Sequence, residues 1–272
     1  MTASSPPRGP AAQAGRAALA GRALRRLVVA SFILLAVLLA GPLLTLAFGS
    51  ASLRADWRAA SHRPAGLAPD PAGHHEAIVQ VYAARTFGWR GAFADHTWLA
   101  AKPEGADRYT RYEVIGWYAR GGGSAMSVSD QRAPDAEWYG NAPRLLRELR
   151  GPAAAAVIAG LPGAVATYPY PHRYSAWPGP NSNTFIAHLG RALPELALAL
   201  PSTAIGKDYL PHGDWFARTP SGTGYQVSLG GVLGLSAAGE EGLELNVLGL
   251  VTGIDWRHPA LKLPGIGRVP SM

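Results

Sequence analysis

The feature that most constrains this chain is a run of 22 residues without a charged side chain, from Leu27 to Phe48. As an α-helix this run would be about 33 Å long, enough to cross the roughly 30 Å hydrocarbon core of a bilayer. Pro42 lies inside the run, and membrane helices tolerate proline because neighbouring groups satisfy the freed backbone. The run therefore predicts a transmembrane helix over residues 27–48, with membrane lipid around it.

The charges on either side of the run predict its orientation. Five arginines and no acid precede it, whereas Arg54 and Arg58 follow it, partly offset by Asp56. Residues 1–26, rich in Ala, Gly, Pro and Arg, predict a basic, disordered tail. By the positive-inside rule we expect this tail in the cytoplasm and the rest of the chain exported across the inner (cytoplasmic) membrane to the periplasm. The alternative is a secretory signal cleaved near residues 49–51. The apolar run exceeds the usual ~7–15 residues of a signal, which favours an uncleaved, single-pass anchor.

The amino-acid composition excludes several classes of function. The chain has no cysteine, which excludes disulfide scaffolds, cysteine-ligated zinc and thiol nucleophiles. Its formal net charge is +7, but residues 49–272 hold 20 basic against 18 acidic side chains. A body so nearly neutral does not predict a nucleic-acid partner. We also expect no cofactor, because the glycine-rich stretches lack the phosphate-loop and dinucleotide-binding patterns.

Beyond the apolar run, residues 49–73 predict a linker, and residues 74–272 predict one α+β domain with a mainly antiparallel sheet. Apolar and β-branched segments predict strands over residues 77–83, 93–101, 109–118, 225–229, 232–236 and 243–252. Apolar spacing, capping residues and proline positions predict helices over residues 143–150, 152–159, 181–190 and 194–200.

The most suggestive candidate for chemistry is Ser182, at the predicted start of the helix over residues 181–190. A hydroxyl there lies at the positive end of the helix dipole, and backbone N–H groups near Asn183 would hold an oxyanion. A serine nucleophile needs a base, and His96, on a predicted strand, is the best candidate. The structural alternative is that Asn181 and Ser182 only cap the helix, the usual role of such residues.

Other polar groups are weaker candidates. The His-His-Glu sequence at residues 74–76 has metal-ligating side chains, but neighbours in a strand point to opposite faces and cannot form one site together. His212 and Asp214 lie in a predicted loop, where such residues usually face solvent or cap a turn. Residues 173–174 and 207–209 fit either the mouth of a pocket or surface ion pairs and loop packing. We therefore expect no metal site.

Four segments beyond the linker carry a family pattern: Thr86-Phe87-Gly88-Trp89-Arg90-Gly91, His96-Thr97-Trp98-Leu99-Ala100, Gly179-Pro180-Asn181-Ser182-Asn183-Thr184-Phe185 and Ala204-Ile205-Gly206-Lys207-Asp208-Tyr209. With these segments the chain resembles the bacterial DUF3750 family of membrane-anchored proteins. The resemblance implies a family and no particular activity.

His96 and the segment from Asn181 to Phe185 are also remotely similar to circularly permuted papain-like domains of the lecithin-retinol-acyltransferase and PPPDE peptidase type. There a strand histidine comes first, and a nucleophilic cysteine follows at a helix N-terminus. The resemblance thus implies a permuted papain-like fold, with His96 as the base and Ser182 in place of cysteine. For the third, orienting residue the following strand offers Glu113 and Tyr112.

Serine is much harder to deprotonate than cysteine, so two functions stay open. In the first, which we favour, the domain is a non-catalytic module of the cell envelope that binds a peptide, glycan or lipid in a papain-like cleft. In the second, it is a serine-dependent hydrolase or acyltransferase that acts on amide or ester bonds through Ser182 and His96.

Overall fold

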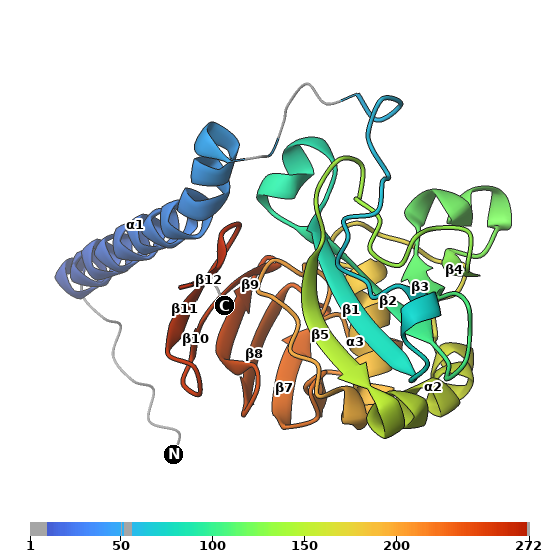
Figure 1. Ribbon diagram of the computed structural model, residues 1–272. Coiled ribbons are helices and arrows are strands. Elements are labelled where there is room, and N and C mark those ends of the chain that lie inside the picture. The colour runs from blue at the N-terminus through green and yellow to red at the C-terminus, as the bar shows by residue number, and fades with distance from the viewer. Residues whose placement is uncertain (1–9, 50, 52–55, 271–272) are drawn as a thin grey trace, which may run out of the picture.

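The computed structural model describes residues 10–49, 51 and 56–270, which form a long helix, a five-stranded sheet with two helices, and a seven-stranded sheet (Figure 1). Helix α1 (Pro10–Phe48) contains the predicted transmembrane run, and its part from Leu19 to Phe48 is long and apolar enough to cross a membrane. The helix starts well before that run. Residues 10–26 of the predicted disordered tail are helical, and residues 1–9 lie outside the described part.

The five-stranded sheet is antiparallel throughout, in the order β4-β3-β2-β1-β5. Its strands are β1 (Ile78–Arg85), β2 (Asp95–Lys102), β3 (Thr110–Val114), β4 (Met126–Ser129) and β5 (Arg144–Arg150). Two 3-10 turns connect neighbouring strands: η2 (Gly88–Ala92) precedes β2, and η3 (Gly116–Gly122) follows β3.

Helices α2 (Gly151–Ala166) and α3 (Ser182–Ala192) cover one face of this sheet, where Leu99 of β2 packs in one core with Leu161 and Phe185. The other face is covered by irregular chain: Trp98 Nε1 donates to the carbonyl of Pro134 at 2.7 Å. Because both faces are covered, β1 and β2 are buried along almost their whole length.

The second half of the predicted linker belongs to this cover. Pro64 forms an isolated antiparallel bridge with Ala136, and a carboxylate oxygen of Asp135 accepts the backbone N–H groups of Leu67 and Ala68 at 2.6 and 3.1 Å. Residues 61–73 therefore pack on the domain instead of forming a free spacer, while residues 50 and 52–55 lie outside the described part.

The prediction of a helix over residues 143–150 is wrong, because residues 144–150 form β5. Val79 of β1 lies opposite Leu149, and Val81 opposite Arg147. The apolar spacing of so short a segment fits helix and strand alike. Pairing decides between them, since β5 satisfies the backbone groups along the edge of β1 and a helix would leave them open. The helix predicted over residues 194–200 is reduced to the 3-10 turn Pro194–Leu196.

The seven-stranded sheet is a meander in which each strand pairs with its neighbour in the chain. Its strands are β6 (Phe216–Arg218), β7 (Gly224–Leu229), β8 (Leu233–Ala238), β9 (Gly242–Val247), β10 (Leu250–Asp255), β11 (Ala260–Leu263) and β12 (Gly267–Val269). The strand predicted over residues 243–252 is divided by a turn at Leu248 and Gly249, whose φ values are 57° and 81°. Glycine adopts such a φ without strain, which favours a reversal here. The predicted α+β class with antiparallel sheets is confirmed.

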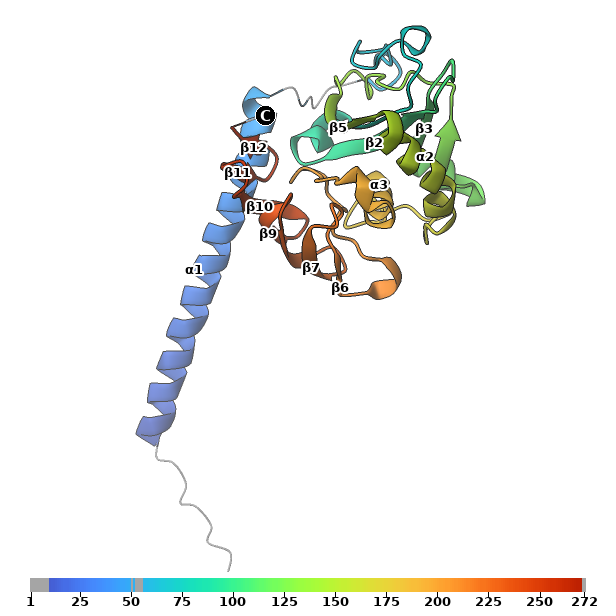
Figure 2. The ribbon, with the colours of Figure 1, turned by 60° about the horizontal axis from the view of Figure 1, so that its bottom comes forward.

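Helix α1 meets the rest of the molecule near its own C-terminal end, beside η2 and the turn between β11 and β12 (Figure 2). Thr45 Oγ1 donates to the carbonyl of Gly265 at 3.2 Å. The N-terminal part of α1 extends away from both sheets.

Candidate functional site

A cavity of about 1120 Å³ lies at one end of the five-stranded sheet. Its wall comes from the segment around η2, the start of β2, η3, and the loop that leads into α3, and Trp57 joins it from the segment that follows α1. His96, Asn183 and Ser182 all line this cavity. Folding therefore brings the predicted base and the predicted nucleophile to one concave surface, although 85 residues separate them in the chain.

His96 is held in place by a carboxylate and by a ring. Its Nε2 lies 3.0 Å from Glu113 Oε2, and Arg111 Nη2 donates to the same oxygen at 3.0 Å. The imidazole stacks on Trp138 with the ring centroids 3.6 Å apart. The other candidate for the orienting position, Tyr112, packs on the opposite face of the sheet, against the α2–α3 core.

The charges of this group follow from its burial. Burial lowers the pKa of His96 below the usual 6.5, and Glu113 only partly opposes this. Burial alone would raise the pKa of Glu113, but the hydrogen bond with His96 and the charge of Arg111 outweigh it and lower that pKa to about 2. We assign a neutral imidazole whose Nε2–H donates to the ionised carboxylate. The acceptor nitrogen Nδ1 then has no partner among the described residues.

Ser182 begins α3, and the residue before it caps the helix. Asn181 Oδ1 accepts the backbone N–H groups of Asn183 and Thr184 at 3.0 and 3.2 Å, and Thr184 Oγ1 accepts the N–H of Asn181 at 3.1 Å. The cap is tied to the following loop, since Asn181 Nδ2 donates to the carbonyl of Ile205 at 3.0 Å. A side chain at Gly206 would collide with Asn181 at 2.4 Å, so only glycine allows this approach.

The cap occupies one of the backbone N–H groups near Asn183 that we expect to hold an oxyanion. The N–H of Asn183 itself donates to Asn181 Oδ1 at 3.0 Å. The amide side chain of Asn183 is also engaged: its Oδ1 accepts from Thr97 Oγ1 at 2.8 Å, and its Nδ2 donates to the carbonyl of Asp95 at 2.9 Å. Asn183 thus joins α3 to β2. In this first turn the N–H of Ser182 is the donor without an acceptor among the described residues.

Strand alternation separates His96 from Ser182. Thr97 faces α3, where its hydroxyl contacts Asn183. Its neighbours in β2, His96 and Trp98, therefore both point to the other face of the sheet. Within the part of the chain that the structure describes, no hydrogen bond joins His96 to Ser182. The direct contact that the papain-like resemblance implies is therefore missing, while the contact of His96 with Glu113 is present.

The cavity wall is cationic and aromatic. Arg90, Arg120 and Arg173 line it, and none of the three has an ion-pair partner among the described residues. The carboxylate of Asp95 also lines it, but it is bound by Arg144 and by Thr203. Six aromatic side chains complete the wall: Trp57, Phe87, Trp117, Trp138, Tyr139 and Tyr174.

Sequence reasoning placed Arg173 and Tyr174 at a possible pocket mouth but missed the other two arginines. The signal that was available is the arginine beside tryptophan at residues 89–90, inside a segment already singled out. Among the other candidates, His74 pairs with Glu76 and His75 with Glu104, so these histidines face different carboxylates. In the described ranges no cluster of three or more histidine or acidic side chains suits a metal ion.

Comparison with known proteins gives one match. The family model described as "Protein of unknown function (DUF3750)" matches residues 76–209, from the start of β1 to the loop that holds Asn181. No curated protein and no solved structure matches the chain. The matched part contains the five-stranded sheet, α2, α3 and most of the cavity wall. It stops before the seven-stranded sheet.

Proposed function

We propose that this chain, which belongs to the DUF3750 family through residues 76–209, is a membrane-anchored binding protein of the cell envelope. Its cavity takes an anionic amphiphile, a molecule with a phosphate or carboxylate group beside an apolar part. The observation that carries the proposal is the excess of cations in the wall. Arg90, Arg120 and Arg173 have no ion pair with any described residue, whereas the carboxylate of Asp95 beside them is already neutralised by Arg144. Such a wall attracts anions, and its rings offer surface to an apolar group.

The position of the cavity supports a ligand that comes from the membrane. Turn η2 contributes Arg90 to the wall and also packs against α1. Trp57 lines the cavity and follows α1 closely in the chain. A ligand bound here therefore lies near the apolar helix, within reach of lipid from the membrane that the helix would enter.

The test is calorimetric titration of the full chain in neutral maltoside micelles. The probe is dihexanoyl phosphatidylglycerol, and dihexanoyl phosphatidylcholine serves as the lipid without net charge. We expect preferential binding of the anionic lipid, and about tenfold weaker binding after Arg90→Gln or Arg120→Gln, because a charge-assisted hydrogen bond is lost. The matched control is Arg108→Gln, which removes an exposed arginine paired with Asp130 outside the cavity wall. Equal affinity for both lipids, or equal affinity in all variants, contradicts the proposal.

A second candidate is the serine-dependent hydrolase or acyltransferase on amide or ester bonds. The observation in its favour is the neutral His96, oriented by Glu113, in the same cavity as Ser182. A water or a substrate group between the two side chains would be needed to carry the proton. Labelling of the full chain with a fluorophosphonate tests this: labelling that is lost in Ser182→Ala and kept in Ser124→Ala supports an enzyme. Labelling that is absent, or that survives Ser182→Ala, favours binding alone.

We also propose that α1 is an uncleaved inner-membrane anchor with its N-terminus in the cytoplasm and the domain in the periplasm. The arginines that precede the apolar run support this orientation. Because the chain has no cysteine, single-cysteine variants can report it. In intact cells, a membrane-impermeant maleimide should label Val128→Cys but not Gly21→Cys, and the opposite pattern would reverse the orientation.

A further inference from the structure

In a sheet of a protein surrounded by water, the apolar face is usually buried and the polar face exposed. The seven-stranded sheet shows the reverse arrangement. Strands β7, β8 and β9 carry large aliphatic side chains on the face that no other part of the described molecule covers. Six of these are 39–59% exposed: Val227, Leu229, Leu233, Leu235, Leu243 and Leu245. They oppose one another across the strands, with Leu235 between Val227 and Leu245, so they form one continuous surface. Monomers in water rarely expose an apolar surface of this extent.

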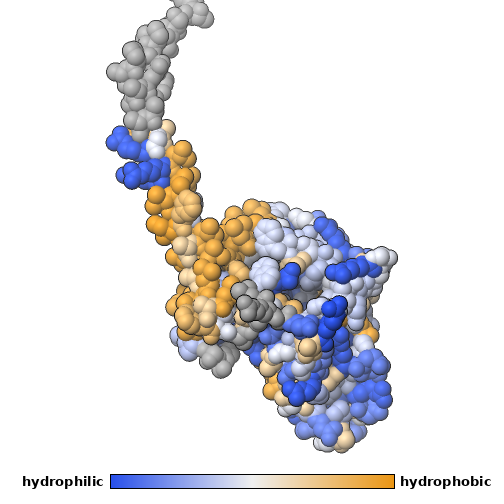
Figure 3. Space-filling view, turned by 90° about the horizontal axis from the view of Figure 1, so that it is seen from above, coloured by the Kyte–Doolittle hydropathy of each residue, from blue (hydrophilic) through white to orange (hydrophobic). Residues whose placement is uncertain are grey.

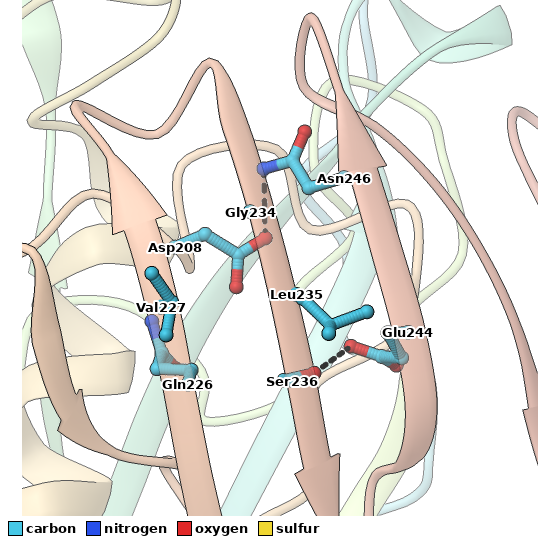
Figure 4. Close-up of a pocket in the computed structure, with 8 residues that line it drawn as sticks. All are labelled: Asp208, Gln226, Val227, Gly234, Leu235, Ser236, Glu244 and Asn246. Atoms are coloured by element: carbon cyan, nitrogen blue, oxygen red, sulfur yellow. Dashed lines mark hydrogen bonds between the residues drawn. The ribbon is translucent and has the colours of Figure 1, made fainter.

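The face that packs on the rest of the domain is polar instead. Glu244 binds Lys207 at 2.5 Å through one oxygen and Lys262 at 2.6 Å through the other, and all three side chains are buried. Asn246 Nδ2 donates to Asp208 at 2.9 Å (Figure 4). Buried charges are stable only with partners in place, and each charged group of this network has one.

Helix α1 packs against the end of this same sheet. Leu38, Gly41 and Pro42 are buried in the contact, and a side chain at Gly41 would lie 2.0 Å from the carbonyl of Pro264 in the turn between β11 and β12. The seven-stranded sheet runs outward from this contact, with its uncovered face on the side of the free part of α1 (Figure 2). The apolar surface of the helix continues onto the adjoining part of the folded body (Figure 3).

The contact fixes the depth of the sheet relative to the apolar run. From Leu27, where the run begins, to Val37, just before the contact, the helix rises about 15 Å, roughly half of the ~30 Å hydrocarbon core. If α1 crosses a bilayer, the contact at residues 38–45 lies within the other half. A polar surface held at that depth would be costly, whereas the uncovered face of this sheet is apolar.

We propose that the uncovered face of the seven-stranded sheet is a lipid-binding surface, seated on the acyl chains of the leaflet that the C-terminal half of α1 crosses. Strands of six residues are about 20 Å long and too short to span a bilayer, which takes about 9–11 residues, so the sheet lies in one leaflet. The edge strands β6 and β12 have three residues each, so few backbone N–H and C=O groups at the edges of the sheet lack a partner strand. These few groups must lie near the headgroups, because hydrocarbon offers them no hydrogen-bond partner. Trp215 and Trp256, both exposed at the margins of the sheet, suit that interface. This surface is separate from the cavity and depends only on α1 entering a membrane.

The absence of cysteine makes the test direct. Four single-cysteine variants of the full chain, Leu235→Cys, Leu245→Cys, Val128→Cys and Phe32→Cys, are placed in phosphatidylcholine–phosphatidylglycerol nanodiscs. Val128, on β4 of the other sheet, is the matched control because it is 51% exposed and Leu235 is 52% exposed. Phe32, on the free part of α1, is the reference for a position in lipid. Each variant is treated with an anionic maleimide, and separately labelled with bimane and exposed to lipids that carry a nitroxide on the acyl chain.

We expect the two sheet positions to react at least about tenfold more slowly than Val128→Cys, because a charged reagent is excluded from hydrocarbon. We also expect their bimane fluorescence to be quenched as at Phe32→Cys and unlike that at Val128→Cys. Rapid reaction at both sheet positions overturns the proposal. Slow reaction without quenching, together with a disulfide between two copies of Leu235→Cys, also overturns it, because a second copy of the chain would then be the occupant.

Discussion

The five-stranded and the seven-stranded sheet both alternate side chains between two faces, but they differ in where their large apolar side chains lie. Strands β1 and β2 place Val, Leu, Tyr and Trp side chains inside, between the helices and the irregular cover. Strands β7 to β9 place Gln, Ser, Glu and Asn inside and leave Leu and Val uncovered. The difference teaches that alternation in a strand identifies which side chains share a face but does not tell which of the two faces is buried. The medium on each side decides which face can be left uncovered.

The largest expected effect is a loss of stability when the buried polar face of the seven-stranded sheet is disrupted. Glu244→Leu should lower the free energy of unfolding by about 3–5 kcal/mol, because it leaves Lys207 and Lys262 buried without their shared partner. Its neighbour in β9, Leu245, points to the uncovered face, and Leu245→Ala should change stability by no more than about 0.5 kcal/mol. Denaturant unfolding of the full chain in micelles, followed by tryptophan fluorescence, measures both. Similar losses in the two variants would show that the two faces are equally buried.

A second prediction compares one leucine from an inner strand of each sheet. Leu99→Ala, in the closed core beneath α3, should cost about 2–5 kcal/mol through the cavity it leaves. Leu235→Ala, on the uncovered face of β8, should cost no more than about 0.5 kcal/mol in micelles. Denaturant unfolding in micelles measures the loss of stability in both variants. A large loss in Leu235→Ala would mean that this face is covered by protein.

A third prediction concerns the helix that carries Ser182. Asn181→Ala removes the cap of α3 and should cost about 0.5–2 kcal/mol, since the N–H groups of Asn183 and Thr184 lose their acceptor. Asn181→Asp keeps an acceptor oxygen but loses the donor to the carbonyl of Ile205, so it should recover only part of the loss. Thermal unfolding of the three proteins orders them. Full recovery in Asn181→Asp would show that the bond to the loop contributes nothing.

The smallest effect is a difference in acid sensitivity. The pKa of His96 is lowered by burial, so the unfolded chain takes up a proton first, and stability should begin to fall as the pH drops below about 6.5. Glu244 is different: its lysine partners outweigh burial and lower its pKa, so its contribution is present above 4.5 and is lost only at lower pH.

Unfolding midpoints measured between pH 7 and pH 5 separate these two groups. His96→Gln should flatten the profile in this window, whereas Glu244→Gln should shift it down without changing its slope. A slope that is unchanged in His96→Gln would contradict the assignment of a neutral, buried imidazole.

Much of the site was predictable because it depends on local signals. The Asn181 cap, the helix after it and the strand that holds His96 follow from residue types within a few positions, and all three are present. The position of Glu113 beside His96 followed from the expectation that it lies on the next strand. The error at residues 144–150 has a non-local cause. Their local spacing suits a helix, and the backbone of β1, more than sixty residues away in the chain, makes them a strand.

The sequence by itself determined the apolar helix and the alternation of β7 to β9, because a charge-free run and a period of two are properties of neighbours in the chain. Tertiary structure alone decided that His96 and Ser182 line one cavity, with no hydrogen bond between them in the described part of the chain. It also decided that Glu244 lies inside and Leu245 outside. The physical reason is that a period of two is symmetric: it tells which side chains share a face, and only the packing of distant segments selects the face that loses its contact with the surroundings.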